Sequence, residues 1–280
     1  MTFERHLTAK EFLARATPFL DRAPAVHRII YLVTSRHSLK DDDGPHRFYA
    51  TFSRGGEVEA AAICDPPFGA VLGGAWSDGL ESLALALGEF WPELPSAQGP
   101  EDDVCRFIPL WARAHDCHPV EGLGETHYEL RQLVEPRTAV GKMQAAEMAN
   151  VELVTTWFRA FWLEAGLSSP LDFEAKSTEA VEAGRMYLWL SGGEPVAMAG
   201  RSERFGNGAS LGPVYTPPHH RKRGYATNLV AAMCRTGLAD GLAFLGLTAD
   251  RENPTSNLIY QRLGFNPVAE TQEVRFIQAT

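Results

Sequence analysis

Two pairs of similar segments, separated by nearly half the chain, constrain the fold of this 280-residue sequence more than any other feature. Residues 48–63 (FYATFSRGGEVEAAAI) and 186–200 (MYLWLSGGEPVAMAG) place β-favouring residues on both sides of Gly-Gly-Glu, which predicts a β-hairpin in each. The two turns are offset by 137 residues (192 minus 55). Residues 124–133 (GETHYELRQL) and 269–278 (AETQEVRFIQ) are offset by 145 residues (270 minus 125). The similar offsets predict a duplicated domain, with a chance pairing of short hairpins as the alternative.

The boundary between the two copies is predicted near residues 134–141 (VEPRTAVG), where Pro and Gly interrupt the pattern. This predicts a domain at residues 1–135 and a second at 136–280, each of ordinary size. Strands alternate with helices after an antiparallel start in each half. The predicted fold class is therefore α/β, with a mixed, mostly antiparallel sheet flanked by helices in two similar domains.

The individual elements follow from hydrophobic spacing and from Gly and Pro positions. The first half is predicted to contain a strand at 3–7, helices within 8–34, a hairpin at 47–63, a helix at 80–90, a proline-rich loop and late strands. The second half is predicted to contain strands near 142–145, at 209–216, 244–248 and 268–277, a hairpin at 186–200, and helices at 151–165, 224–239 and 254–263.

Composition excludes several classes of protein. The formal net charge of -9 argues against a nucleic-acid-binding protein, because phosphate binding needs positive charge spread over a surface. No apolar run approaches the roughly 20 residues that cross a bilayer, so no membrane association is expected. The first residues, MTFERHLTAKEF, carry charges where a signal peptide is apolar, which predicts a cytoplasmic location.

Cysteines and histidines give no sign of a disulfide framework or a metal site. The four cysteines are few for this length and have no CxxC spacing. The densest group, formed by Cys105, His115, Cys117 and His118, lacks the spacing of known zinc clips. No metal is therefore expected.

A basic segment opens one predicted helix. Residues 219–233 (HHRKRGYATNLVAAM) begin with five potentially positive side chains and continue with helical apolar spacing, and the prolines just before them must end a strand. The first turn of a helix has unpaired N–H groups and a positive dipole end, which together bind anions such as pyrophosphate. Gly224 and Ala226 keep this backbone open to a ligand, and Arg221, Lys222 and Arg223 add positive charge around the rim of the anion site. A turn whose basic residues are merely solvated is the alternative.

The spacing Arg221-x-x-Gly224-x-Ala226 resembles the Q/R-x-x-G-x-G/A signature of the GNAT superfamily of acyltransferases. It differs from a Walker loop and from a Rossmann turn. The resemblance implies that backbone N–H groups of this loop bind the pyrophosphate of coenzyme A, from Lys222, Arg223, Gly224, Tyr225, Ala226 and Thr227. It also implies that the preceding strand residues, Val214, Tyr215 and Thr216, offer their backbone to the pantetheine arm.

A second motif lies downstream at residues 247–265 (LTADRENPTSNLIYQRLGF) and resembles the GNAT N-x-x-x-Y-x-x-x-G-F region. Here Asn257 and Tyr260 are three residues apart, so they share one helix face. The resemblance implies that Asn257 hydrogen-bonds the coenzyme arm and that Tyr260 is the general acid for the leaving thiolate. Asn257 follows Arg221 by 36 residues (257 minus 221), and the two motifs in this order are more specific than either alone.

The resemblance implies an N-acetyltransferase that moves an acetyl group from acetyl-CoA to a primary amine of a small molecule by direct attack, without a covalent enzyme intermediate. A backbone N–H near Tyr215 is a candidate for polarising the thioester. Many family members place a glutamate base on the strand before the loop, but residues 209–216 contain none. Asp250 is the nearest carboxylate, Glu203 is its rival, and an amine can also reach the site through water without a dedicated base.

The first half has no comparable signature, which suggests a degenerate GNAT-like domain that shapes or covers the acceptor pocket. Trp76, Trp91 and Trp111 either line a cleft or belong to the core. Two alternatives to the leading interpretation stay open. One is a sensor or scaffold that binds acyl-CoA without turnover, and the other is a tandem enzyme that acylates a sugar-thiol precursor. The sequence identifies neither the acceptor nor the oligomeric state.

Overall fold

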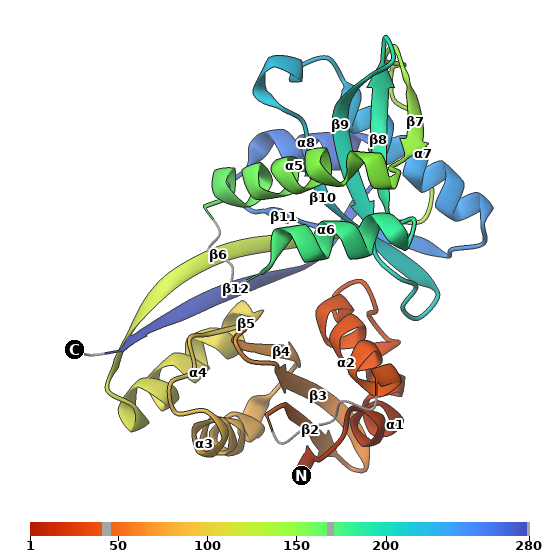
Figure 1. The fold of residues 1–280 in the computed structure, drawn as a ribbon. Helices are drawn as coiled ribbons and strands as arrows, with labels where there is room; N and C mark the ends of the chain where they lie inside the picture. Colours follow the sequence, from red (N-terminus) through yellow and green to blue (C-terminus); the bar gives the residue numbers. More distant parts are fainter. Residues whose placement is uncertain (41–45, 167–170, 279–280) are drawn as a thin grey trace. The chain divides into compact units, whose positions relative to one another are not determined.

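The computed structural model describes residues 1–40, 46–166 and 171–278. The chain forms two compact units, and neither is continuous in sequence (Figure 1). Unit 1 consists of Met1–His127, Thr248–Asn253 and Pro267–Thr280. Unit 2 consists of Tyr128–Leu247 and Pro254–Asn266. The boundary predicted for the sequence duplication, between residues 135 and 136, stays a prediction.

Unit 1 is built on a sheet with the strand order β1-β2-β3-β4-β5-β12. Its first four strands are antiparallel, β4 and β5 are parallel, and β12 is antiparallel to β5. The strands are β1 (Thr2–His6), β2 (Phe48–Arg54), β3 (Glu57–Cys64), β4 (Ala70–Gly74), β5 (Ser96–Pro100) and β12 (Asn266–Gln278). The helices are α1 (Ala9–Leu20), α2 (Arg28–Lys40), α3 (Leu80–Phe90), which follows the short 3-10 helix η1 (Ser77–Gly79), and α4 (Glu101–Ala114).

Unit 2 repeats this plan, with the strand order β11-β10-β9-β8-β7. The strands from β7 to β10 are antiparallel, and β10 is parallel to β11. The strands are β7 (Lys142–Ala145), β8 (Met186–Ser191), β9 (Glu194–Arg201), β10 (Gly208–Tyr215) and β11 (Phe244–Asp250), and the long strand β6 (Cys117–Leu130) ends in this unit. Figure 1 shows α5 (Val151–Glu164) and α6 (Phe173–Glu182) in front of these strands, with α7 (Tyr225–Ala239) and α8 (Pro254–Arg262) behind them. The predicted fold class is confirmed: each unit is α/β, with a mostly antiparallel sheet flanked by helices.

The core of unit 1 includes a strand from the far end of the sequence. β12 pairs with β5 over five residues, from Thr271 opposite Pro100 to Arg275 opposite Ser96. Its buried Phe276 ring packs on Phe107 and Trp111 of α4, with ring centroids 6.3 and 5.7 Å apart. The last strand of the chain therefore completes a core that the first hundred or so residues begin.

Most elements agree with the sequence prediction, but the strand β4 and two helices were missed. Helix α4 was not predicted because two prolines, Pro100 and Pro109, flank or interrupt its pattern; three acidic residues in its first turn favour the helix dipole. Helix α6 begins at an Asp172 cap whose side chain accepts two backbone N–H groups. Of the two alternatives for the tryptophans, the core is correct for Trp76 and Trp111, which are fully buried in the hydrophobic core of unit 1.

All four cysteines carry free thiols. Among the described residues, no helix has the length and apolar character needed to span a bilayer.

Candidate functional site

The site in unit 2 is built where β10 gives way to α7. After Tyr215 the chain runs through the 3-10 helix η3 (Pro218–His220) to Gly224, which caps α7 with a left-handed backbone (φ +77°). A Cβ at Gly224 would meet Asn228 and Ala139 only at ordinary contact distance, so the backbone twist, not crowding, favours glycine here. Lys222 also has a positive φ, of 64°.

This twist leaves a run of backbone donors without partners. Across the described ranges, no hydrogen bond is found from the backbone N–H groups of residues 222–227, and no side chain caps the helix. The first N–H groups of an α-helix have no intrahelical acceptor, and the helix dipole adds partial positive charge to them. The Lys222 and Arg223 side chains come from the same loop. The start of α7 is therefore suited to bind an anion through main-chain donors.

Arg221 holds the loop against the end of α5. Its Nε donates to the Thr216 carbonyl (2.9 Å), and its Nη2 donates to Glu164 Oε2 (2.5 Å). The Tyr215 hydroxyl donates to the other oxygen of Glu164 (2.9 Å). Burial alone would raise the pKa of Glu164, but the hydrogen bonds from Arg221 and Tyr215 lower it. The Arg221 guanidinium is thus engaged in positioning the loop, and the Arg223 side chain hydrogen-bonds with the Tyr225 hydroxyl.

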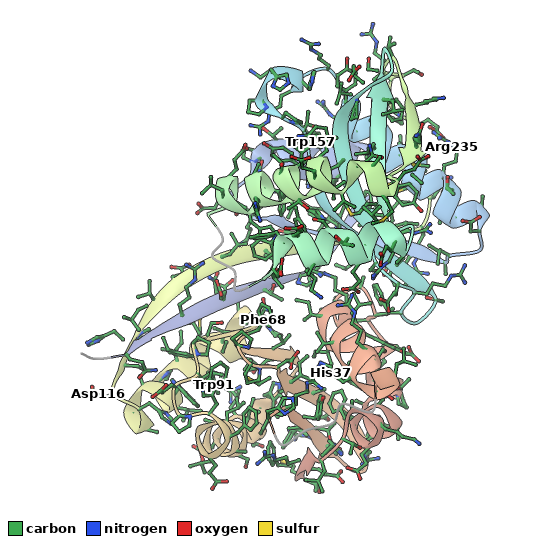
Figure 2. All side chains as sticks on the ribbon, in the orientation of Figure 1. His37, Phe68, Trp91, Asp116, Trp157 and Arg235 are labelled. Atoms are coloured by element: carbon green, nitrogen blue, oxygen red, sulfur yellow. The ribbon has the colours of Figure 1, made fainter. Side chains whose placement is uncertain are left out.

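The other side of the loop is fixed by the segment that precedes β7. Asn228 of α7 accepts a hydrogen bond from the Ala139 N–H (3.2 Å) and donates to the carbonyls of Arg137 (3.1 Å) and Gly224 (3.0 Å). Arg235, labelled in Figure 2, makes a bidentate ion pair with Glu135 (2.6 and 3.0 Å). Residues 135–139 therefore pack along α7 and support its first turn.

Strand β10 carries a bulge at its carboxyl end. Leu211 pairs with Arg201 of β9, but the next pair is Val214 with Ala199, so β10 has one extra residue. The parallel pairing of β10 with β11 covers only Gly208–Ser210. A bulge bends and twists its strand, and here it interrupts the ladder at residues 212–213, while Val214 and Tyr215 beyond it pair again with β9. This is the stretch from which the sequence analysis selected Val214 and Tyr215, with Thr216 following directly.

Helix α8 follows β11 as α7 follows β10, so both helices begin at the same edge of the parallel pair. The Asn257 amide accepts a hydrogen bond from the hydroxyl of Tyr128 (3.0 Å), which lies on β6. Tyr260 is 9% exposed, and its ring packs against Tyr128 and Phe265 at centroid distances of 6.3 and 5.8 Å. Burial raises the pKa of Tyr260 to about 12, so its phenol is neutral at physiological pH.

The two carboxylates considered as bases both have structural partners. Asp250 ends β11 and accepts the Glu252 N–H through Oδ1 (2.8 Å), the geometry of an Asx turn. It belongs to unit 1, whereas the loop and Tyr260 belong to unit 2. Glu203 accepts a hydrogen bond from Arg185 (2.8 Å). The structure therefore brings Tyr215, Arg221, Gly224, Asn257 and Tyr260 together in one compact unit, without Asp250.

Three residues of this region were missed by the sequence analysis: Glu164, Asn228 and Tyr128. Glu164 and Asn228 carry no motif, because their partners lie 57 and about 90 residues away along the chain. Tyr128 lies in the repeated segment 124–133, but that segment was assigned to the other half. Among the described residues, no group of three or more His, Cys, Asp or Glu side chains is arranged to hold a metal ion.

Comparison with known proteins gives a family for the second half. Residues 151–265 match the sequence model of the acetyltransferase (GNAT) family. No curated protein matches the sequence significantly. Solved structures resemble the whole chain, among them a Drosophila protein (TM-score 0.68, 14% identity, 99% of both chains covered). A GCN5-related N-acetyltransferase from Sphaerobacter thermophilus gives a TM-score of 0.65 at 15% identity, with 99% of this chain and 96% of that chain covered.

A tandem GNAT protein from the clavulanic acid biosynthesis pathway also aligns with all of both chains (TM-score 0.58, 13% identity). At these identities the likeness shows the fold, and it extends over both units.

Proposed function

Because residues 151–265 form a domain of the acetyltransferase (GNAT) family, we propose that this protein transfers an acetyl group from acetyl-CoA to a primary amine of a small molecule by direct attack. The observation that carries the proposal is the run of unpartnered N–H groups over residues 222–227 at the start of α7. A diphosphate matches this site because each of its oxygens accepts hydrogen bonds and its charge opposes the helix dipole.

In the proposed reaction, unit 2 supplies binding and charge stabilisation. The N–H groups of residues 222–227 hold the pyrophosphate, and the backbone of residues 214–216 and the Asn257 side chain hold the arm. A backbone N–H near Tyr215 donates to the thioester oxygen as negative charge develops there. The amine attacks the carbonyl carbon, the carbon–sulfur bond breaks, and the neutral phenol of Tyr260 donates its proton to the departing thiolate.

Removal of a proton from the amine does not require a committed carboxylate. Asp250 stays our candidate for the base, with water relay as the alternative. Its Oδ1 already accepts the Glu252 N–H of the Asx turn. Replacement of Asp250 by Asn should then leave kcat nearly unchanged if water carries the proton, and should lower kcat at least tenfold if Asp250 does.

Unit 1 takes no coenzyme in this proposal. Its turn between β4 and α3 is occupied by a carboxylate of the protein itself: the Trp76 N–H donates to Asp103 Oδ2 (3.0 Å). Asp103 is buried on α4, and Arg106 closes the same turn by donating to the Ser77 carbonyl (2.7 Å). An internal anion at this position opposes a second one, because like charges in a buried turn repel.

A binder of acyl-CoA without turnover is the second candidate, and the surroundings of the catalytic candidates favour it. Tyr260 is almost fully buried, and both carboxylates considered as bases have structural partners. This candidate binds the coenzyme at the same site and differs only in that no acyl group is transferred.

The two candidates separate in one experiment. The protein is incubated with acetyl-CoA and a panel of primary amines, free thiol is measured, and calorimetry with CoA measures binding. The proposed function predicts CoA binding, thiol release that depends on the amine, and a loss of at least tenfold in kcat in Tyr260→Phe with little change in CoA affinity. Binding without thiol release for any amine favours the binder, and no binding of CoA contradicts both.

A further inference from the structure

Tyr128 contacts both of the α8 residues that the site uses, although it comes from a strand of the first half of the sequence. Its hydroxyl donates to Asn257 Oδ1 (3.0 Å) and accepts from Gln261 Nε2 (3.4 Å). Its ring meets the Tyr260 ring at a centroid distance of 6.3 Å and an interplanar angle of 54°. Tyr128 is 2% exposed, so these contacts are held in a packed environment. From this geometry we infer that Tyr128 is a positioning residue, which orients Asn257 by its hydroxyl and Tyr260 by its ring.

The hydrogen bond fixes which end of the Asn257 amide is presented to a ligand. A phenol hydroxyl can rotate and can donate or accept, but an amide nitrogen only donates. Gln261 donates to Tyr128, so the Tyr128 proton is directed to Asn257 Oδ1. The Nδ2 end of the amide then points away from Tyr128. This inference rests on the proposed function and adds to it that Asn257 donates through Nδ2 to a carbonyl of the coenzyme arm.

The ring contact has a separate effect. Tyr260 lies between the rings of Tyr128 and Phe265, and both pairs are tilted rather than stacked face to face. Such tilted contacts are favourable and restrict the rotation of each ring. Loss of the Tyr128 ring would leave Tyr260 with a gap on one side, whereas loss of the hydroxyl alone would leave this packing intact.

The repeat in the sequence gives the corresponding position in unit 1 a different chemistry. With the offset of 145 residues, Tyr128 corresponds to Glu273 of β12. Glu273 accepts from Arg275 (3.2 Å) and has no phenol to offer a helix that follows β5. The Tyr128 arrangement is therefore a property of unit 2, the unit with the unpartnered loop.

The test separates the two contacts by the choice of variant. Tyr128→Phe removes the hydroxyl and keeps the ring, and should weaken the binding of acetyl-CoA about 5- to 10-fold, with kcat changed less than twofold. Tyr128→Leu removes the ring as well, and should also lower kcat. Tyr187→Phe is the control, because Tyr187 lies on β8 of the same unit and its ring contacts Arg201 instead; it should match the wild type.

A double-mutant cycle provides a result that a purely structural role would not produce. In an Asn257→Ala background, Tyr128→Phe should have no further effect on acetyl-CoA affinity, since the group that the hydroxyl orients is gone. The inference would be overturned if Tyr128→Phe had equal effects in both backgrounds, or if the single variant bound acetyl-CoA as tightly as the wild type. In either case, binding of CoA by the wild type would leave the proposed function standing. Absence of CoA binding to the wild type would overturn the proposed function, and the inference with it.

Discussion

The strand at the end of the chain should control the stability of the unit at its beginning. Phe276 is 4% exposed and packs on Phe107 and Trp111, so Phe276→Ala removes an aromatic ring from the core of unit 1. A buried Phe covers about 150–250 Å² of apolar surface, which corresponds to about 4–6 kcal/mol at about 25 cal/mol per Å². Incomplete relaxation and residual contacts bring the expected loss to about 3–5 kcal/mol. That is a large part of the stability of an ordinary domain.

Hydrogen exchange read by mass spectrometry can locate the effect. In Phe276→Ala, amides of β5 and α4 should exchange much faster than in the wild type, and those of β8 and β9 in unit 2 should change little. Ile277→Ala is the matched control, because Ile277 is the next residue on β12 and is 54% exposed; its effect should stay below about 0.5 kcal/mol. A loss below about 1 kcal/mol for Phe276→Ala, or faster exchange mainly in unit 2, would refute the reasoning.

Four further predictions concern coenzyme binding. Glu164→Gln should weaken acetyl-CoA binding, measured by calorimetry, about three- to tenfold, because Arg221 loses its charged partner at the loop. The control Glu182→Gln, at an exposed position of α6, should leave the affinity unchanged. Hydrogen bonds from Arg221 and Tyr215 outweigh burial and lower the pKa of Glu164, so the ion pair is present above the ordinary carboxyl pKa and is lost only as the pH falls through the lowered value. Acetyl-CoA affinity should therefore show no transition from Glu164 between pH 5 and 8. A midpoint in that range that vanishes in Glu164→Gln would contradict this. Gly224→Ala should cost about 1 kcal/mol of stability and weaken coenzyme binding, since φ +77° is strained for any residue with a Cβ. Gly241→Ala is the control, because Gly241 also has a positive φ but lies past the end of α7; this variant should lose stability but not affinity for the coenzyme. Calorimetry should give one coenzyme per chain, and a second site of similar affinity would contradict the role given to Asp103.

Local patterns predicted the elements because each is encoded within a short window. The helix at 80–90 and the strand at 142–145 agree with α3 and β7 residue for residue, since their limits are set by neighbouring Gly, Pro and polar residues. The loop before α7 was predicted for the same reason: Gly224 and the basic residues are adjacent in sequence. Helix α4 was missed because Pro109 lies within it, and its stability depends on packing of Phe107 and Trp111 in the core of unit 1.

Long-range pairings could not be predicted from the same windows. The Arg221 side chain had been assigned to the rim of the anion site, but it pairs with Glu164, 57 residues earlier. Tyr128 and Asn257 are 129 residues apart, and no local sequence pattern near either residue predicts the hydrogen bond between them. The assignment of β12 to unit 1 depends on which sheet edge is open when the chain returns, a property of the assembled fold.

The two units differ in the length of the turn at the position of the proposed anion site. Residues 75–79, five in number, join β4 to α3 in unit 1, whereas residues 216–224, nine in number, join β10 to α7 in unit 2. The short turn draws the Trp76 N–H to the buried Asp103 carboxylate, so the donor is satisfied from within. The longer turn passes through Lys222 and Gly224 at positive φ, and within the described parts of the chain no partner is found for the N–H groups of residues 222–224. Residues 222–224 are exposed, so water can satisfy these donors until an anion displaces it, whereas the Trp76 N–H is already occupied by a carboxylate of the protein.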